Sequence, residues 1–308
     1  MTVRPLATAD LEAVATRVEE RLTHDARRNA LINPHFSEDL FVAALANATD
    51  QTWVEDTHGR IAGHLYGAVL ESLEHGRGAW IGPDGASFDS DEVLAALYRT
   101  ASETWTRLGA AHHFVWVFDA PEDTRPWRDL GFAPVHRRGL LDLSALDDTA
   151  LPAGYVIRRG GAADLDLAVE LDRLIDEAES TRRTPLLSDL DQVTNAWREL
   201  LEDEEVSYYV VEFDGHGVAQ CVAYPLEPRR GSFDHTLHLS AVAVRSEHEH
   251  RGVARAMVTA ALHVARREGF LYAEANWNVT NERAEHFWTR YGFARTYARL
   301  RRTPISAS

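Results

Sequence analysis

The sequence of 308 residues lacks lysine altogether, so its 32 basic residues are all arginine, and it has one cysteine, Cys221. A single cysteine cannot form an internal disulfide, and no Cys/His spacing is typical of a zinc site, so we expect no metal. No apolar stretch approaches the ~18 residues of a transmembrane helix. The start of the chain also lacks the apolar run of a signal peptide. These absences predict a soluble, cytoplasmic protein with Cys221 as a small buried apolar residue.

Positive charge is also scarce, because 48 acidic residues outnumber the basic ones and give a net charge of −16. A nucleic-acid-binding surface needs a basic face to neutralise phosphates. We therefore expect neither nucleic acid nor membrane as a partner. The acidic balance instead favours a cationic small molecule.

Short stretches of the first half recur in order in the second half, at a slowly increasing offset. This pattern predicts a duplicated domain, because the period far exceeds that of solenoid repeats. The natural boundary is Leu151–Gly154, which gives domains 1–150 and 151–308. The matching stretches are Val3-Arg4 and Ala9-Asp10-Leu11 with Ile157-Arg158 and Ala163-Asp164-Leu165, His58–Ala62 with Gly215–Ala219, and Trp127, Gly131, Phe132 and Ala133 with Trp288, Gly292, Phe293 and Ala294.

A strand, a turn and a helix in the second half carry the clearest chemical signal. The pattern predicts a strand over Leu237–Val244 and an amphipathic helix over Gly252–Glu268 that stops at Gly269. A tight turn into a helix presents unpaired backbone N–H groups and the positive end of the helix dipole, which suits a diphosphate. Gly252 lets a ligand approach the backbone, and Arg251 and Arg255 add positive charge.

Downstream of that helix lies the pattern Asn278-x-x-Asn281-x-x-Ala284-x-x-Phe287-Trp288-x-x-x-Gly292-Phe293. With the strand and turn, it resembles the GNAT superfamily of acyl-CoA-dependent N-acetyltransferases. The resemblance is good over about residues 155–303 and holds only in outline for the first half. It implies an α/β fold of two tandem GNAT-like domains, each with a central mixed β-sheet flanked by helices.

The resemblance also implies roles for individual residues. A splayed strand would offer backbone groups to the pantetheine arm of acetyl-CoA, the co-substrate, and Asn281 would lie near the pantetheine or the phosphates. His238 occupies the position of a general base, a role that suits an imidazole near neutral pH. Asp234 and His235 are close alternatives. The residues expected to bind the co-substrate are Val242, Ala243, Val244, Glu249, His250, Arg251, Gly252, Val253, Ala254, Arg255 and Asn281.

Two positions depart from the family pattern. Glu249 stands where the family has Gln or Arg, which places an acid where the diphosphate approaches. Trp288 stands where the family often has a tyrosine that protonates the departing thiolate. Tyr291, Tyr272 or a water molecule could supply that proton. Because Cys221 has no partner for a ping-pong route, direct attack of the amine on the thioester is the preferred mechanism.

The first half lacks the phosphate-binding pattern. The corresponding segment, Asp84–Leu94, has no Arg-x-x-Gly-x-Gly/Ala and places Asp89, Asp91 and Glu92 at a helix start. Carboxylates there stabilise the helix but repel a diphosphate. We therefore expect domain 1–150 to be a degenerate, structural domain and domain 151–308 to bind acetyl-CoA.

The acceptor is less well specified. The loop Glu177–Asp189 would line its groove, and Arg182 and Arg183 favour a carboxylate or phosphate on the acceptor, whereas the acidic run Glu202–Glu205 favours an amine. The sequence predicts an acetyl-CoA-dependent N-acetyltransferase for the primary amine of a small molecule. A catalytically silent acyl-CoA-binding or scaffold protein, and a protein or peptide N-acetyltransferase, are the alternatives. A homodimer is left open.

Overall fold

The computed structural model describes residues 2–35, 41, 42, 45, 51–72, 76–180, 190–227 and 231–304. The chain divides into two compact units. Unit 1 comprises Met1–Arg138, Arg229–Phe233 and Arg295–Ser308, and unit 2 comprises Gly139–Pro228 and Asp234–Ala294. These units are defined by contacts, whereas the boundary at residues 150 and 151 concerns the duplication of the sequence and stays a prediction.

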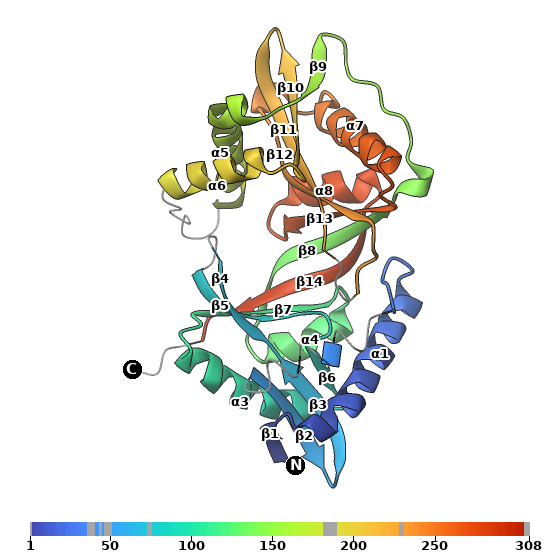
Figure 1. The fold of residues 1–308 in the computed structure, drawn as a ribbon, viewed down its shortest axis with the longest axis vertical. Coiled ribbons are helices and arrows are strands. Elements are labelled where there is room, and N and C mark those ends of the chain that lie inside the picture. Colours follow the sequence, from blue (N-terminus) through green and yellow to red (C-terminus); the bar gives the residue numbers. More distant parts are fainter. Residues whose placement is uncertain are drawn as a thin grey trace. The chain divides into compact units, whose positions relative to one another are not determined.

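Unit 1 contains strands in two groups, with helices packed against them (Figure 1). The strand order is β1-β2-β3-β6 in one group and β4-β5-β7-β14 in the other, with the first part of β8 beyond β14. The elements are β1 (Thr2–Pro5), α1 (Leu11–Arg28), β2 (Thr52–Thr57), β3 (Arg60–Tyr66), β4 (Ala68–Ser72), β5 (Gly76–Ile81), β6 (Ala86–Phe88), α3 (Asp91–Arg107), β7 (His112–Phe118), α4 (Pro121–Asp129), β8 (Ala133–Asp142) and β14 (Ala294–Arg302).

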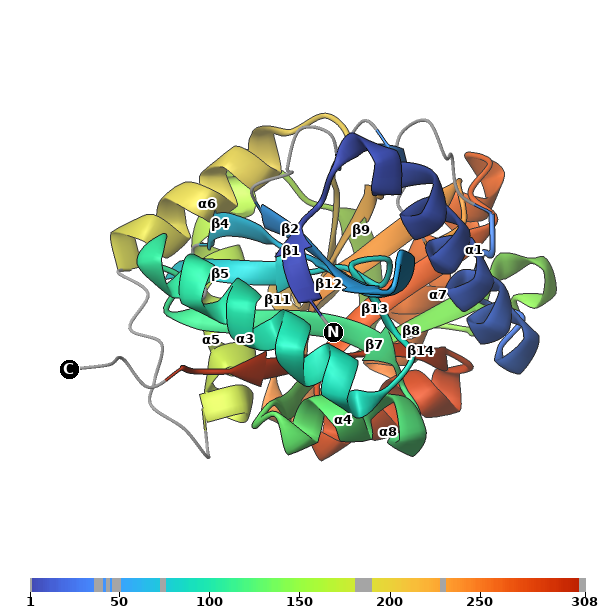
Figure 2. The same cartoon turned by 90° about the horizontal axis from the view of Figure 1, so that it is seen from below.

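Alternation along β2 explains why α1 and α3 cover opposite faces of these strands (Figure 2). Successive side chains of a strand point to opposite faces. Trp53 packs in the cluster that holds the apolar face of α3, and Val54 packs in the cluster that holds the apolar face of α1. Each helix therefore covers one half of an alternating strand pattern.

The last strand of the chain, β14, belongs to unit 1. It pairs antiparallel with β7, from Tyr297 opposite Phe118 to Arg302 opposite His113. Tyr297 and Leu300 are 1% and 0% exposed. Strand β8 is shared, because its residues up to Arg138 belong to unit 1 and those from Gly139 belong to unit 2. Unit 1 thus depends on a strand from the far end of the sequence.

Unit 2 is built on the strand order β13-β12-β11-β10-β9, with the second part of β8 beside β13. All neighbours from β9 to β12 are antiparallel, and β12 and β13 are parallel. The elements are β9 (Tyr155–Arg159), α5 (Leu165–Ser180), α6 (Leu190–Glu202), β10 (Ser207–Phe213), β11 (His216–Pro225), β12 (Thr236–Val244), α7 (Val253–Arg267), β13 (Tyr272–Asn278) and α8 (Glu282–Tyr291).

Two apolar clusters cover the two faces of this sheet. The cluster on one face joins α5 and α6 to strand residues such as Tyr208 and Val222, and the cluster on the other joins α7 and α8 to residues such as Leu237 and Leu239. Figure 1 shows the two pairs of helices on opposite sides of β10 to β12. The expected fold class, mixed sheets flanked by helices in two related domains, is confirmed.

The first sequence repeat is explained by an ion-paired arginine at the start of each unit. In unit 1, Arg4 contacts Asp10 at 2.6 Å and Asp56 at 3.1 Å. In unit 2, Arg158 contacts Asp164 at 2.6 Å and Glu212 at 2.6 Å. The hydrogen bond from Arg158 lowers the pKa of Asp164. In both units, the arginine therefore links the first strand to the turn that precedes the first helix and to the next strand.

The repeat that contains His58 needs a small correction. The two hairpins turn at His58-Gly59 and at Asp214-Gly215, and all four residues have positive φ. The true match therefore aligns Gly59 with Gly215, one residue away from the alignment that the sequence suggested. The turn conformation, which the letters do not show, decides the register.

The third repeat forms the same corner in both units. Trp127 and Phe132 meet edge-to-face with ring centroids 5.2 Å apart, and Trp288 and Phe293 do so at 4.9 Å. The intervening glycine has a positive φ in each case, 89° and 122°. The same buried pair after the same helix end confirms that the two halves share one architecture.

Candidate functional site

The centre of the candidate site is a bulge in β12. The parallel ladder between β12 and β13 runs from Thr236 opposite Tyr272 to Leu239 opposite Ala275, and no further pair of these strands is recorded in the described residues. Beyond it, β12 stays paired with β11, with a register shift opposite Cys221 and a positive φ of 47° at Ala241. The bulge therefore turns β12 away from β13 and frees backbone groups on that edge.

The bulge also changes the alternation of side chains along β12. Counting by twos places Val242 on the same face as His238. In the structure, Ala241 packs with the α5 and α6 cluster, whereas Val242 and Val244 pack with the α7 cluster. The extra residue inverts the alternation. The side chains of Val242 and Val244, in the predicted pantetheine-binding stretch, therefore lie on the α7 face of the sheet and not on the face of His238.

The turn between β12 and α7 has the backbone shape of an anion site. After the turn Ser246–His248, His250 and Gly252 both have positive φ, 58° and 84°. Gly252 caps α7 without a side-chain hydrogen bond, and a Cβ added there would have nothing within 4 Å. The first helical hydrogen bond is made by the N–H of Ala256 to the Gly252 carbonyl, so the amides just before Ala256 have no partner within the helix. His250 is a non-glycine residue in the left-handed region, a conformation that costs energy and that occurs at ligand-binding turns as well as in hairpins.

The charge that Glu249 brings to this turn is compensated. Both carboxylate oxygens of Glu249 contact Arg283 Nη1, at 3.1 and 3.0 Å. The Arg283 guanidinium therefore reduces the repulsion that the Glu249 carboxylate would exert on a diphosphate. Arg251 and Arg255 are exposed, and the Arg255 guanidinium lies 4.9 Å from the centre of the Tyr291 ring. The turn thus keeps exposed positive charge beside its free amides.

Asn281 and Trp288 have clear structural roles. The Asn281 side chain accepts a hydrogen bond of 3.0 Å from the Ala284 N–H and so caps α8. Trp288 is buried in the α7 and α8 cluster. A tryptophan in the core cannot act as the acid that a tyrosine supplies elsewhere in the family. The predicted role of Asn281 near the co-substrate stays a prediction.

The candidate bases differ in their surroundings. Asp234 and His235 are exposed and precede β12, at the end remote from the turn. His238 lies within the strand, three residues before Ala241, and is 8% exposed. Its ring centroid lies 5.0 Å from that of Tyr224. Of the three, His238 alone is held in a fixed environment next to the bulge.

The sequence analysis did not select the acidic residue that lies beside His238. Glu274, on β13, is its partner in the parallel ladder and is 0% exposed. Its Oε1 lies 3.5 Å from His238 Nδ1. The signal in the sequence was an acidic residue inside the otherwise apolar stretch 270–275, because charged residues are almost never fully buried without a partner.

Cys221 is a buried free thiol, as expected. It lies in the α7 cluster with 0% exposure, and burial raises the pKa of its thiol to about 12. A thiol of that kind is neither ionised nor accessible near neutral pH. It is therefore unsuited to carry an acyl group.

Residues 171–293 match the family model described as the Acetyltransferase (GNAT) family. This chain contains a GNAT acetyltransferase domain. The matched segment covers the bulge, the turn and both flanking helices of the candidate site. No curated protein matches the sequence significantly.

Solved structures extend the likeness to almost the whole chain. A GCN5-related N-acetyltransferase from Sphaerobacter thermophilus has a TM-score of 0.66 at 17% identity and covers 98% of this chain and 95% of its own. A tandem GNAT protein from the clavulanic acid biosynthesis pathway has a TM-score of 0.54 at 16% identity and covers 99% of both chains. At these identities the likeness concerns the fold, which is shared from end to end.

The counterpart of the GNAT turn in unit 1 differs from expectation in its charge. Ser90, rather than a carboxylate, caps α3 by accepting from the Val93 N–H. Asp89 is paired with Arg17 at 2.8 Å and with Arg60 at 2.6 Å. The acids at this helix start are thus partly balanced, so repulsion alone does not close the turn. The expectation that this unit binds no CoA stays a prediction.

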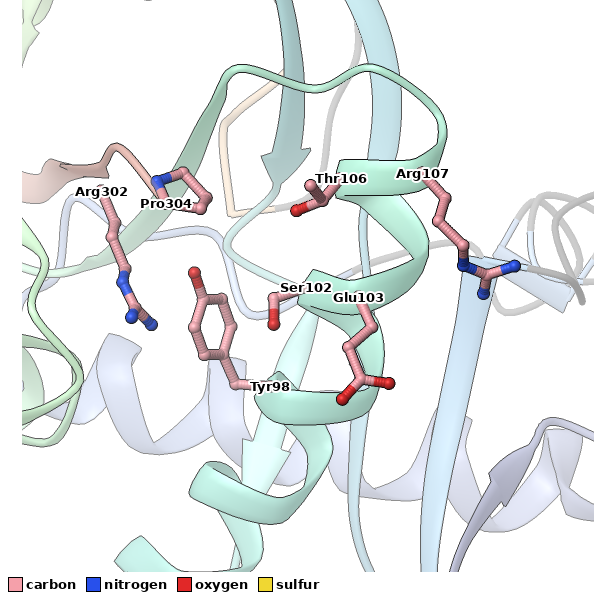
Figure 3. Close-up of a pocket in the computed structure, with 7 residues that line it drawn as sticks. All are labelled: Tyr98, Ser102, Glu103, Thr106, Arg107, Arg302 and Pro304. Carbon is pink, nitrogen blue, oxygen red and sulfur yellow. The ribbon is translucent and has the colours of Figure 1, made fainter. Parts of the chain in front are cut away.

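An open pocket of about 540 Å³ lies elsewhere in unit 1 (Figure 3). Side chains from the C-terminal half of α3 line one side of it, and Arg302 and Pro304 line the other. It mixes one acid with two arginines. It lies at the wrong end of its helix for the dipole to favour an anion.

The loop expected to line the acceptor groove lies only partly within the described residues. Of the loop Glu177–Asp189, residues 181–189, with Arg182 and Arg183, lie outside the described residues.

In the part of the chain that the structure describes, no helix is long and apolar enough to cross a membrane. Nor does that part contain a cluster of three or more His, Cys, Asp or Glu side chains that could hold a metal ion.

Proposed function

We propose that the chain is an acetyl-CoA-dependent N-acetyltransferase that acetylates the primary amine of a small molecule, with the reaction in unit 2. The observation that carries this proposal is the combination of the β12 bulge with the uncapped start of α7. The bulge frees the backbone of Ala243 and its neighbours for the amides of a pantetheine arm. A few residues later, the αL conformation of Gly252 leaves the backbone open to a diphosphate.

The residues around the turn fit this co-substrate. Amide groups from His250 to Arg255 would bind the diphosphate oxygens, and Arg251 and Arg255 would add charge. The pairing of Glu249 with Arg283 keeps its carboxylate from standing alone beside the phosphates. The turn is therefore suited to bind an acyl-CoA in the orientation that directs its thioester toward the bulge.

His238 would accept the proton of the attacking amine. The amine nitrogen attacks the thioester carbonyl carbon, a C–N bond forms, and the N–H proton passes to the free imidazole nitrogen, directly or through a water. The C–S bond then breaks and CoA leaves as a thiolate. The products are the N-acetylated amine and CoA.

The proton that the thiolate finally takes does not require a dedicated tyrosine. The Tyr291 hydroxyl shares a hydrogen bond of 2.7 Å with Thr259, and burial raises the pKa of Tyr291. That makes Tyr291 a poor proton donor in its present contact. A thiolate is a good leaving group, and a water or the protonated His238 can neutralise it.

The test combines binding with turnover. Thermal unfolding with acetyl-CoA measures binding, and release of the CoA thiol with a panel of amines measures transfer. We expect stabilisation by acetyl-CoA in both the wild type and His238→Ala. We expect thiol release with at least one amine that falls by about 10²–10⁴-fold in His238→Ala, the range of general base catalysis.

Two outcomes would point elsewhere. Stabilisation without thiol release for any small amine would favour the silent acyl-CoA-binding alternative, which the buried Trp288 supports. Release with peptides that have free N-termini or lysines, and not with small amines, would favour a protein acetyltransferase. No stabilisation by acetyl-CoA would refute the proposal.

A further inference from the structure

We propose that Glu274 is a positioning residue for His238: its carboxylate holds the imidazole with Nδ1 toward β13 and leaves Nε2 for the acceptor amine. This inference rests on the proposed function, because it assigns a role to Glu274 in the same reaction. It adds a second residue to the site, from a strand that the sequence pattern did not connect with catalysis.

The geometry places the two side chains on one face of adjacent strands. His238 and Glu274 are direct partners in the parallel ladder, and Glu274 Oε1 lies 3.5 Å from His238 Nδ1. That distance is too long for an aligned hydrogen bond. Within the described residues, Nδ1 is a buried atom with no hydrogen-bond partner. Such contacts often tighten only when substrate is bound.

Unit 1 provides an internal comparison for this pair. In unit 1, β5 and β7 are also parallel and also form four residue pairs, and the third pair is Trp80 with Phe114. These two rings are stacked, with centroids 4.1 Å apart and planes at 17°. In unit 2, the third residue pair between β12 and β13 is His238 with Glu274, so the two pairs occupy corresponding places.

This comparison shows that the fold does not require an ionisable pair at the third position of the parallel ladder. An apolar stack fills the corresponding place in the unit that lacks the phosphate-binding pattern. A buried carboxylate is costly, and replacing a buried ion pair by apolar residues is often neutral or stabilising. The retention of His238 and Glu274 in unit 2 therefore points to chemistry rather than packing.

The chemistry follows from the two nitrogens of the ring. In neutral His238, Nδ1–H directed at the Glu274 carboxylate leaves the lone pair on Nε2, which accepts the amine proton. The imidazolium that forms is then stabilised by the adjacent carboxylate. Among the described residues whose contacts with His238 are known, Tyr224 on β11 is the other titratable group that faces it.

The experiment compares the steady-state kinetics of Glu274→Gln with those of the wild type, with acetyl-CoA and an amine as substrates. The amide keeps the shape and can still accept from Nδ1–H, but it removes the negative charge. We expect kcat with an amine to fall on the order of 10- to 100-fold, below the effect of losing the base. The KM for acetyl-CoA should change less than about twofold, because the carboxylate lies away from the diphosphate turn.

A matched control and a double variant separate positioning from stability. Glu55→Gln removes another fully buried carboxylate, in unit 1, and should leave activity unchanged. In a His238→Ala background, Glu274→Gln should have little further effect, because residues that act as one unit are not additive. Glu274→Asp should recover part of the activity.

The double variant His238→Trp with Glu274→Phe, which copies the unit 1 pair, should bind acetyl-CoA without turnover. Unchanged activity in Glu274→Gln, or additive losses when Glu274→Gln is combined with His238→Ala, would overturn the role of Glu274. Full activity of His238→Ala would instead overturn the choice of base in the proposed function.

Discussion

At the residue scale, the histidines of this chain differ by their surroundings rather than by their sequence context. His64, in unit 1, is buried with both ring nitrogens bonded: Nδ1 to Ser87 Oγ at 2.7 Å and Nε2 to the Asp84 carbonyl at 3.1 Å. A carbonyl only accepts, so Nε2 carries the proton and Nδ1 accepts from Ser87. His238 has a carboxylate where His64 has a hydroxyl. His64, which is neutral and fully bonded, supports the fold, whereas His238 is the base of the proposed reaction.

This difference predicts an acid-sensitive contribution to stability from His64. Burial lowers the pKa of His64 from 6.5 to about 4. Because the unfolded chain binds the proton more readily, the contribution is complete above about pH 6.5 and is lost as the pH falls toward 4. His64→Asn should reduce the pH dependence of the unfolding free energy by up to about 1.4 kcal/mol per pH unit in that interval, measured by urea unfolding.

The control for this measurement is the exposed His58, whose φ of 55° also tolerates asparagine. His58→Asn should keep the wild-type slope. Equal slopes for His64→Asn and the wild type would contradict this prediction, because they would mean that the ring takes up its proton at the same pH in the folded and the unfolded chain.

At the scale of elements, the sequence predicted the parts that depend on local composition. The strand, the turn and the helix of the candidate site were expected at 237–244 and 252–268, and they occur at Thr236–Val244 and Val253–Arg267. Glycine at both ends of the helix, with an apolar stripe between them, is enough to specify that element.

The bulge at Ala241 and the pairing of His238 with Glu274 could not be predicted in this way. Both depend on which strands are neighbours and in which register. A single extra residue inverted the alternation at Val242. The sequence analysis used residue types and their spacing, and these do not determine which residues on neighbouring strands are paired.

The two ends of α7 give a matched test of the diphosphate site. Gly252 and Gly269 both have positive φ, 84° and 97°, and an added Cβ would meet nothing within 4 Å at either. Leucine at either position should cost a similar ~1 kcal/mol of backbone strain. Gly252→Leu should also abolish acetyl-CoA binding, measured by calorimetry, because its side chain lies over the free amides. Gly269→Leu should bind normally. Equal affinity in both variants would refute the placement of the phosphates.

At the scale of the whole molecule, duplication has produced units that do not coincide with the two halves of the sequence. Unit 1 includes β14 from the end of the chain, and unit 2 includes the part of β8 that begins at Gly139. Gly139 lies so close to Trp277 that an added Cβ would come within 2.7 Å of its ring. The repeats in the sequence indicated two related domains, but repeated letters cannot show which copy a terminal strand joins.

This arrangement predicts how the chain behaves when it is divided between residues 150 and 151. Fragment 1–150 lacks β14, with its buried Tyr297 and Leu300, and fragment 151–308 lacks the part of β8 that begins at Gly139. Each fragment alone should show no cooperative unfolding and should tend to associate through its unpaired strand edge. An equimolar mixture should regain the near-ultraviolet dichroism of the intact chain, because each fragment supplies the strand that the other lacks. The intact chain, nicked at an engineered protease site between the same residues, should stay associated on gel filtration. If fragment 151–308 alone unfolds cooperatively at the temperature of the intact chain, the shared strands are dispensable, and the halves of the sequence are the folding units after all.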